Sequence, residues 1–405
     1  MKILRDRRLA ALLAAEVISS TGTQMTWVAL PWFVLRTTGS PERMTWVIIA
    51  EVLPVGVFGF FGGAVAARFG TRRTMLVSDL TRVPLFAAVP ALHSAGLLPF
   101  GGLLAIVAVS GVFLAPYFSV QRAVVPELIG EEQMDVAYAT AFFQAANRLT
   151  ICIGPPLAGV LISLISPARV LYVDAATYLV LFLLVGAFVR PPEVTTEGPP
   201  TRVLDGVRFM LRDKLLRVWT PAFTLIDICW QLLFASLPVL VVTHYHASPR
   251  ILGVLFGAFG FGALAGAFAS LPAVRHIEAL TLGAGAFCFE MVSLWILAIP
   301  GVWEVPFAGL AFAGFFTSVV NAPTLTLVTL RIPRELRTHA LSSFAVFQCI
   351  GSPIGLVLAG AALTHYDARA VLAVVLALQT VGAAAFVTAA LVERTSLRAS
   401  LDSPG

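Results

Sequence analysis

The sequence predicts an all-α polytopic membrane protein with twelve transmembrane helices. About a dozen stretches of roughly 20 residues carry almost no charge, and a stretch of that length spans the ~30 Å hydrocarbon core of a bilayer. Charged residues make up only 12% of the 405 residues, against about 25% in average proteins, and the mean hydropathy is +0.90. Twelve such spans use nearly the whole chain, so no room remains for a sizeable soluble catalytic domain.

Polar, glycine and proline clusters separate the apolar stretches, and each stretch is expected to form one helix. The first begins with basic residues, as a signal peptide does, but its apolar part continues to Leu35, which is too long for a cleaved signal. We therefore expect it to be retained as a transmembrane helix. The expected spans are 9–36, 43–66, 74–93, 98–121, 136–165, 168–189, 217–243, 250–272, 279–300, 304–330, 339–363 and 369–391.

The positions of lysine and arginine predict the orientation of these spans. If the N-terminus is cytoplasmic, most of the 27 basic residues fall in the inner connections. The outer connections then hold only Arg36, Arg43, Arg169, Arg250 and Arg369. Because basic residues are retained on the cytoplasmic side, we expect a multi-pass protein of the plasma (cytoplasmic, inner) membrane with both termini inside. The net charge of +5 is then explained by topology, and no nucleic-acid partner is expected.

Three parts of the chain are expected. Residues 1–190 are predicted to form an N-terminal six-helix bundle, and residues 217–405 a C-terminal six-helix bundle with a short tail. Residues 191–216 are predicted to be a cytoplasmic linker: its first part is rich in proline, glutamate and threonine and is typical of a flexible segment. Its second part, Val203–Leu216, has apolar residues at helical spacing with basic residues between them, which favours an amphipathic helix on the inner membrane face.

The two bundles are predicted to be repeats of one another. Five residues of the first half recur in the second half at one constant spacing: Gln24, Leu30, Pro31, Pro116 and Pro126 recur as Gln231, Leu237, Pro238, Pro323 and Pro333. The segment Gly154–Gly159 also resembles Gly351–Gly355, at a shorter spacing. Several matches at one spacing indicate a duplicated six-helix unit, as in transporters built from parallel repeats.

The connection after the second span resembles the signature G-x-x-x-D-R-x-G-x-R-R of the major facilitator superfamily. The matching residues are Gly63, Arg68, Gly70, Arg72 and Arg73, and Ala67 stands where the family has aspartate. Gly63 allows close helix approach, Gly70 allows a tight turn, and the arginines stay at the inner interface. In the family the aspartate helps to latch the two halves in the outward-facing state, so the resemblance implies a conformational latch.

Asp79 and Arg82 extend this predicted latch into the third span. They are three residues apart, so they share one helix face and can form a conformational ion pair. Because Ala67 lacks a carboxylate, the latch is either weakened or moved to Asp79.

The order of further motifs resembles the drug- and siderophore-exporter branch of the superfamily, typified by the enterobactin exporter. These motifs are Pro116…Arg122…Pro126-Glu127-Leu128, Gly154-Pro155-Pro156 and Gly206…Arg208…Arg212-Asp213. The resemblance implies a major facilitator fold of two six-helix bundles and alternating access about a midplane site. The Gly-Pro cluster also resembles the antiporter motif of the fifth helix, although a proline kink with small-residue packing explains it equally well.

Ionisable residues inside a membrane span are costly and are therefore candidates for function. Glu16 lies about 10 Å into the first span at 1.5 Å per residue, and Asp227 and Gln231 share a face of the seventh. The resemblance implies that the first, fourth, seventh and tenth helices line a central cavity. The candidates for substrate binding or proton coupling are Glu16, Gln24, Glu51, Arg148, Asp227, Gln231 and Asn321.

The carboxyl candidates have a functional and a structural interpretation. A carboxyl group in a partly desolvated cavity can bind a proton from outside and release it inside. Alternatively, Glu16 or Asp227 only pairs with an arginine to hold helices together, and Arg148 is the natural partner in the first half. Asp174 and Glu290 fall in helices that are peripheral in this fold, and local hydrogen bonds are expected for them.

The sequence therefore predicts a secondary active transporter, a proton-coupled exporter (antiporter) of small amphipathic compounds such as drugs, siderophores or secondary metabolites. A lysolipid or lipid flippase of the same fold is the alternative. The expected partners are the substrate, protons and the lipid bilayer, and a monomer is expected. An enzyme is not expected, because no nucleophile context, phosphate loop or His/Cys cluster occurs, and the four cysteines lie singly in apolar spans. No cofactor and no metal site is expected.

Overall fold

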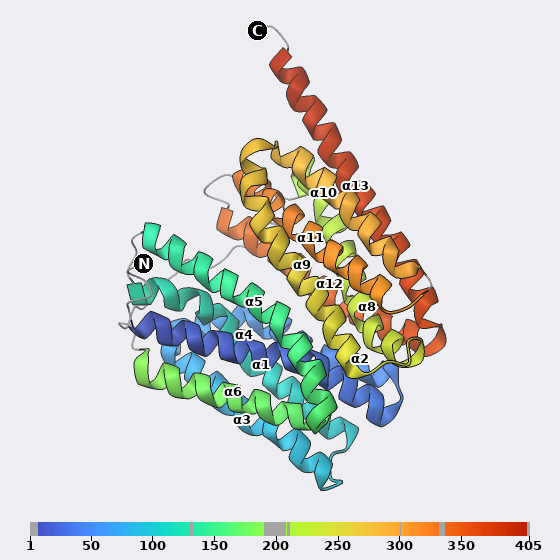
Figure 1. The fold of residues 1–405 in the computed structure, drawn as a ribbon. Helices are drawn as coiled ribbons and strands as arrows, with labels where there is room; N and C mark the ends of the chain where they lie inside the picture. The colour runs from blue at the N-terminus through green and yellow to red at the C-terminus, as the bar shows by residue number, and fades with distance from the viewer. Residues whose placement is uncertain are drawn as a thin grey trace. The chain divides into compact units, whose positions relative to one another are not determined.

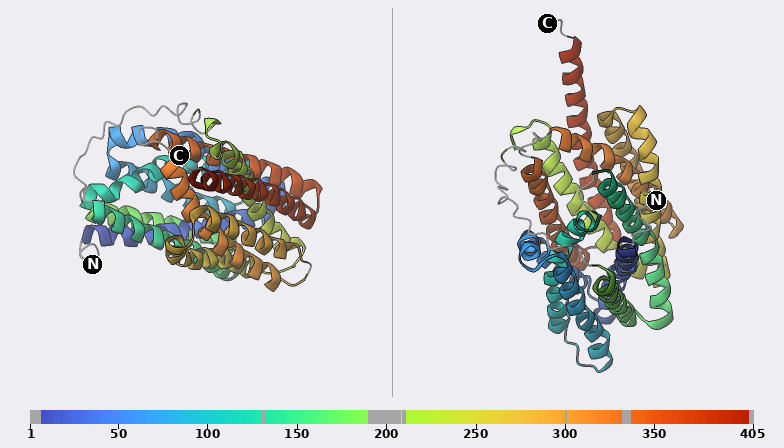
Figure 2. Two further views of the ribbon diagram at one scale, coloured as in Figure 1. Left: turned by 90° about the horizontal axis from the view of Figure 1, so that it is seen from above. Right: turned by 90° about the vertical axis from the view of Figure 1, so that its left-hand side faces the viewer.

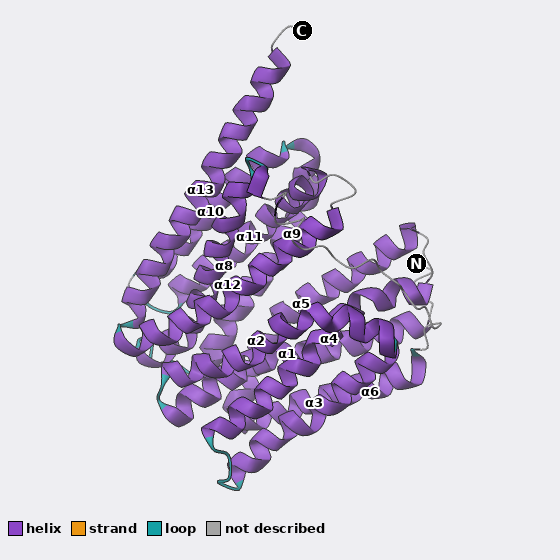
Figure 3. Cartoon of the chain, turned by 180° about the vertical axis from the view of Figure 1, so that it is seen from behind, coloured by secondary structure: helices purple, strands orange, loops and turns teal. Residues whose placement is uncertain are grey.

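The fold was analysed in a computed structural model, which describes residues 7–129, 133–189, 208, 211–299, 301–331 and 337–402 (Figure 1). Within these ranges the regular elements are all helices, as Figure 3 shows. Twelve of them are long α-helices, and nine are long and apolar enough to cross a membrane by length and composition. The predicted all-α polytopic fold is thus confirmed.

The chain divides into two compact units. The first unit consists of Met1–Gly198 with His246–Gly257, and the second of Pro199–Tyr245 with Ala258–Gly405. Most of the predicted linker and its amphipathic helix fall outside the described residues, so the boundaries at 190 and 216 stay a prediction.

The first unit contains six α-helices that run along one another (Figure 2). They are α1 (Arg7–Thr38), α2 (Pro41–Phe69), α3 (Thr71–Ser94), α4 (Phe100–Ile129), α5 (Gln133–Ile165) and α6 (Pro167–Phe188). Apolar residues occur all round these helices, as expected for helices immersed in lipid and protein. Prolines inside them, such as Pro31 and Pro54, are tolerated because neighbouring helices and side chains satisfy the freed backbone groups.

The second unit contains five complete α-helices, the part of α9 from Ala258 onward, and one short 3-10 helix. They are α8 (Leu216–Thr243), α9 (Pro249–His276), α10 (Ala279–Trp295), η2 (Ile296–Ala298), α11 (Glu304–Arg331), α12 (Arg337–His365) and α13 (Ala368–Asp402). The carboxylate of Asp213 accepts the backbone N–H groups of Leu215 and Leu216, both at 3.0 Å, at the start of α8. The last turns of α13 extend beyond the neighbouring helices of this unit (Figure 1).

The tight turn predicted at Gly70 is present between α2 and α3. Gly70 has φ of +79°, a left-handed conformation that glycine adopts without steric cost. Its carbonyl accepts the backbone N–H of Thr74 at 3.1 Å, which starts α3. A side chain at position 70 would strain this turn, so the glycine is required for the reversal of the chain.

Helix pairing is the same in the two units. In the first, α1 packs on α5 and α6, and α3 packs on α4 and α6. In the second, α8 packs on α12 and α13, and α10 packs on α11 and α13. These four pairings are equivalent in the two units, as the predicted duplication requires.

The glycine contacts define the register of the repeat. A Cβ added to Gly154 would lie 2.5 Å from Cβ of Gln24 and 3.3 Å from the carbonyl of Thr21. A Cβ added to Gly355 would lie 2.8 Å from Cβ of Gln231 and 2.6 Å from the carbonyl of Ile228. Gly154 thus corresponds to Gly355.

The resemblance of Gly154–Gly159 to Gly351–Gly355 pairs Gly154 with Gly351, and the packing shifts that register by one helical turn. The pairing of Gly154 with Gly351 was wrong because it followed the shared sequence Gly-x-Pro. The feature that the two units share is a glycine in close contact with the backbone of α1 or α8.

A substitution on α4 tests the close packing of the first unit. A Cβ at Gly111 would collide with the backbone carbonyl of Glu51 on α2 and lie 3.2 Å from Cβ of Pro54. We expect Gly111→Ala to destabilise the protein by about 1–3 kcal/mol, the usual cost of overpacking. Gly101→Ala on the same helix is the matched control, because nothing lies within 4 Å of its Cβ position.

Thermal unfolding of the purified protein, followed by tryptophan fluorescence, measures both variants. Gly101→Ala should match the wild type or exceed its midpoint, since alanine favours helix. An unchanged midpoint in Gly111→Ala would contradict the tight α2–α4 contact.

Candidate functional site

Glu16 is held inside the first unit by two neutral donors from α4. Its Oε1 accepts a hydrogen bond of 2.5 Å from the hydroxyl of Tyr117, and its Oε2 accepts one of 2.7 Å from the amide of Gln121. The side chain is only 5% exposed. The alternative pairing of Glu16 with Arg148 is not formed, because Arg148 lies exposed on α5.

Arg82 lies at the centre of a second polar cluster of the first unit. Its guanidinium donates to the hydroxyl of Tyr178 on α6 and, through Nε, to Ser110 on α4 at 3.4 Å. The same group lies over the Tyr178 ring at 3.8 Å from its centroid, a cation–π arrangement. Arg82 is 2% exposed, so one buried charge links α3, α4 and α6.

Asp174 is the most completely hydrogen-bonded carboxylate of this cluster. Its Oδ2 accepts from Thr26 on α1 at 2.5 Å and from Tyr178 at 3.1 Å. Its Oδ1 accepts from Thr177 at 3.2 Å. The local hydrogen bonding predicted for Asp174 is confirmed, and it joins α1 to α6 as well.

Asp79 and Glu51 lie near Arg82 but are not bonded to it. Both carboxylate oxygens of Asp79 and Oε1 of Glu51 are buried without a hydrogen-bond partner. The conformational ion pair predicted between Asp79 and Arg82 is therefore absent from this structure. Tyr178 and Ser110 compete for the guanidinium, and helical spacing alone could not reveal these two partners.

The signature residues lie where the resemblance placed them, at the α2–α3 connection. Arg72 donates to the backbone carbonyl of Gly186 on α6 at 2.5 Å. Arg68 lies exposed with its guanidinium 5.6 Å from the centroid of the Phe69 ring. Arg73 is exposed on α3. Gly63 belongs to α2, but the surroundings of Gly63 and the side chain of Ala67 lie outside what the structure describes.

The second unit brings Asp227 and Gln231 of α8 together with Ser352 of α12. The hydroxyl of Ser352 donates to Oδ2 of Asp227 at 3.0 Å and accepts from the amide of Gln231 at 2.8 Å. All three residues are half-buried.

Aromatic side chains continue the same face of α8 beyond Asp227. Trp230 and Phe234 stack with ring centroids 5.1 Å apart, and both contact Phe259 of α9 at 5.1 and 5.3 Å. With Asp227 and Gln231 these α8 residues follow helical spacing, so a carboxylate and aromatic rings border one another.

The remaining candidates have no hydrogen bond to Glu16 or Asp227 in the described part of the chain. Gln24 is half-buried on α1, where its Cβ faces Gly154. Asn321 is exposed on α11, and Arg148 is exposed on α5. The structure does not join these three residues to Glu16 or to Asp227 through hydrogen bonds within either unit.

Glu290 in the second unit confirms the expectation of local hydrogen bonding. Its Oε1 accepts from Thr317 on α11 at 3.0 Å, and its side chain is buried. Thr317 stands at the same repeat spacing from Ser110 as Gln231 does from Gln24. The hydroxyl at this repeated position therefore serves a buried cation in one unit and a buried acid in the other.

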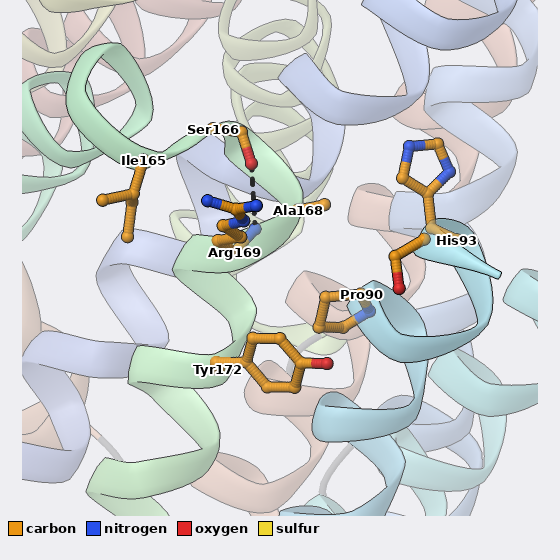
Figure 4. Close-up of a pocket in the computed structure, with 8 residues that line it drawn as sticks. Pro90, His93, Ile165, Ser166, Ala168, Arg169 and Tyr172 are labelled. Carbon is orange, nitrogen blue, oxygen red and sulfur yellow. Dashed lines mark hydrogen bonds between the residues drawn. The ribbon is translucent and has the colours of Figure 1, made fainter.

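Two cavities lie in the described residues at places that the sequence did not indicate. One, of about 570 Å³, lies at the ends of α3 and α6; Figure 4 shows Arg169 and Tyr172 of α6 on one side of it and Pro90 and His93 of α3 on the other. The other, of about 400 Å³, has a mostly apolar lining at the start of α8. None of the predicted site residues lines either cavity.

Sequence reasoning missed Tyr117, Gln121, Tyr178, Thr26 and Ser352, which hold the buried charges in place. Hydroxyl and amide groups are common in membrane helices, so residue type alone does not single them out. The sequence offered a signal for two of them. Ser352 follows Gly351 in the glycine-containing segment of α12, and Thr26 lies on the polar side of α1 that begins at Glu16.

The comparisons with known proteins agree with this architecture. The family model described as Major Facilitator Superfamily matches residues 12–288 and 220–404. The multidrug efflux pump Tap of Mycolicibacterium fortuitum is 25% identical over 368 residues, covering 87% of this chain and 88% of that protein. Tap of Mycobacterium tuberculosis (strain ATCC 25618 / H37Rv) is 22% identical over 366 residues, covering 86% and 85%.

Solved structures show the same fold at low sequence identity. The nucleoside transporter NupG superposes with a TM-score of 0.79 at 10% identity, covering 94% of this chain and 99% of that chain. A bacterial homologue of the iron transporter ferroportin in the inward-facing state gives a TM-score of 0.71 at 14% identity, covering 95% and 98%. With the family match over nearly the whole chain, these findings confirm the predicted fold, and the protein is a polytopic membrane transporter that belongs to the Major Facilitator Superfamily.

Proposed function

We propose that this protein is a proton-coupled exporter of small amphipathic compounds. The observation that carries the proposal is the pair of neutral donors on Glu16, because both Tyr117 and Gln121 can hold a carboxyl group in its charged and its neutral form. An arginine partner would instead hold the group in its charged form. A buried carboxyl without a permanent counter-ion is what a reversible proton carrier requires.

The Asp227 group of the second unit supports the substrate class. A half-buried carboxylate beside the rings of Trp230 and Phe234 suits molecules with a positive charge and an apolar, planar body. The likeness to multidrug efflux pumps favours drug-like compounds among such molecules. Ser352 can rotate its hydroxyl between Asp227 and Gln231, so the group can adapt to different substrates.

In the proposed mechanism the two six-helix bundles alternate in access about a midplane site. Substrate would bind from the cytoplasm while the carboxyl groups are charged, and protons entering from outside would neutralise them and weaken substrate binding. The protein would act as a monomer in the plasma membrane. Both termini would lie inside, an orientation that the distribution of arginine favours.

Accumulation of a compound panel in cells with and without the protein tests this function. The panel contains dyes, antibiotics, siderophores and lysolipids, each measured with and without a protonophore. We expect lower accumulation of amphipathic cations in cells with the protein, and reversal of this difference by the protonophore. A change confined to lipid distribution, insensitive to the protonophore, would instead establish the flippase alternative.

The Glu16→Gln variant tests the coupling residue. Glutamine keeps both hydrogen-bond partners but cannot exchange a proton, so protonophore-sensitive export should fall to the level of cells without the protein. Expression in the membrane should remain unchanged. Glu42→Gln, at the exposed start of α2, is the control and should transport normally. Full proton-driven export by Glu16→Gln would rule out Glu16 as the coupling residue.

The Asp227→Asn variant tests the substrate contact. A charged hydrogen bond contributes about 1.5–3 kcal/mol, so the apparent Kd for cationic substrates should rise about tenfold or more. Neutral substrates should change by less than about threefold. Ser236→Ala is the control, since Ser236 on the same helix bonds only to its own helix at Leu232. Equal losses of affinity for cationic and neutral substrates would contradict the role of Asp227 in recognising positive charge.

A further inference from the structure

The cluster around Arg82 encloses more carboxyl groups than one guanidinium can neutralise. Three acids interact electrostatically with Arg82 inside the first unit, and each comes from a different helix. They are Glu51 of α2, Asp79 of α3 and Asp174 of α6. Since all four side chains are buried, the charges must nearly balance among themselves.

Asp174 is the acid best suited to carry the negative charge. It accepts hydrogen bonds from Thr26, Thr177 and Tyr178, and such donors stabilise the ionised form. Tyr178 also accepts from Arg82, so one hydroxyl connects the anion and the cation. Arg82 and Asp174 therefore form a neutral pair through Tyr178, and the other acids have no counter-ion left.

Asp79 differs from Asp174 in having no donor. Both of its oxygens are buried without a hydrogen-bond partner, and its side chain is 0% exposed. An ionised carboxylate in this position would be desolvated and unpaired, which is strongly unfavourable. Arg82 lies one helical turn further along α3, so a change of side-chain conformation could bring its guanidinium to Asp79.

Asp79 interacts electrostatically with members of both polar groups of the first unit. Three titratable or charged groups interact with Asp79 directly: Glu16 of α1, Arg82 of its own helix and Tyr117 of α4. Glu51 of α2 and Asp174 and Tyr178 of α6 interact with its neighbour Arg82. Arg82 attracts the ionised Asp79 carboxylate, and Glu16 repels it. Asp79 is thus the acid common to the Glu16 group and the Arg82 cluster.

We propose that Asp79 is a second proton-binding site and that its proton controls the partner of Arg82. With the proton bound, Arg82 donates to Tyr178 and Ser110 as observed. When the proton leaves the Asp79 carboxyl for water or another base, the carboxylate left behind attracts the guanidinium, and Arg82 exchanges Tyr178 for Asp79. This exchange loosens the α3–α6 contact. The role of the exchange in transport rests on the proposed function, but the proton site itself does not.

Infrared difference spectroscopy of the purified protein in lipid nanodiscs, without substrate, tests this site. Spectra at low and high pH are compared in the region of the protonated-carboxyl C=O stretch. Glu16 and Asp79 should both contribute to the loss of this band as pH rises. We expect Asp79→Asn to lack one component of that loss, the Asp79 band, and Glu16→Gln to retain it. Glu290→Gln is the control, because it removes a buried acid of the other unit and should retain the Asp79 signal.

Two further variants make the assignment specific. In Arg82→Gln the counter-ion is absent, so the Asp79 band should persist and its midpoint should shift upward by about one pH unit or more. In Glu51→Gln the band should remain. A wild type without a titrating band, an unchanged band in Asp79→Asn, or loss of the band in Glu51→Gln instead would each overturn the proposal.

The outcome is separate from that of the proposed function. If export proves insensitive to a protonophore while Asp79 titrates, the coupled-export proposal fails and the proton site stands. If export is proton-driven and Asp79→Asn leaves the spectrum unchanged, the site fails and coupling remains with Glu16.

Discussion

A single buried guanidinium organises the first unit of this transporter. Lipid offers no partner for a charge, so Arg82 must be satisfied inside the protein, and it draws Ser110 and Tyr178 toward itself from two other helices. Tyr178 in turn places Asp174, which reaches α1 through Thr26. The positions of α1, α3, α4 and α6 are therefore linked through one chain of polar contacts.

The two units share a scaffold but differ in the charge at their centres. Ser110 and Thr317 stand at repeated positions, yet one meets Arg82 and the other Glu290. The first unit holds several acids around one cation, whereas Glu290 accepts a hydrogen bond from a hydroxyl and, among the residues that the structure describes, has no charged partner. The duplicated fold thus places its dense network of titratable groups in the first unit, the same unit that contains Glu16.

The fold was largely predictable because lipid imposes simple rules on sequence. The apolar stretches predicted the helical spans, and the signature around Gly70 predicted its turn. The positions of arginine predict the orientation in the membrane. Partners of buried charges were not predictable, because Arg82 and Asp79 are correctly spaced for a pair that Tyr178 and Ser110 prevent. Contacts such as Tyr117 to Glu16 join residues far apart in the chain, and only the packing of α1 on α4 reveals them.

The glycines of α5 and α12 have a mechanical consequence. At Gly154 and Gly355, backbone rests directly on Gln24 and Gln231 without a side chain between the helices. Contacts this close leave no room for a side chain, so a larger residue at either glycine would push α5 away from α1 or α12 away from α8. Each unit therefore has one helix separation that is fixed by a single glycine, next to the residues proposed to bind substrate.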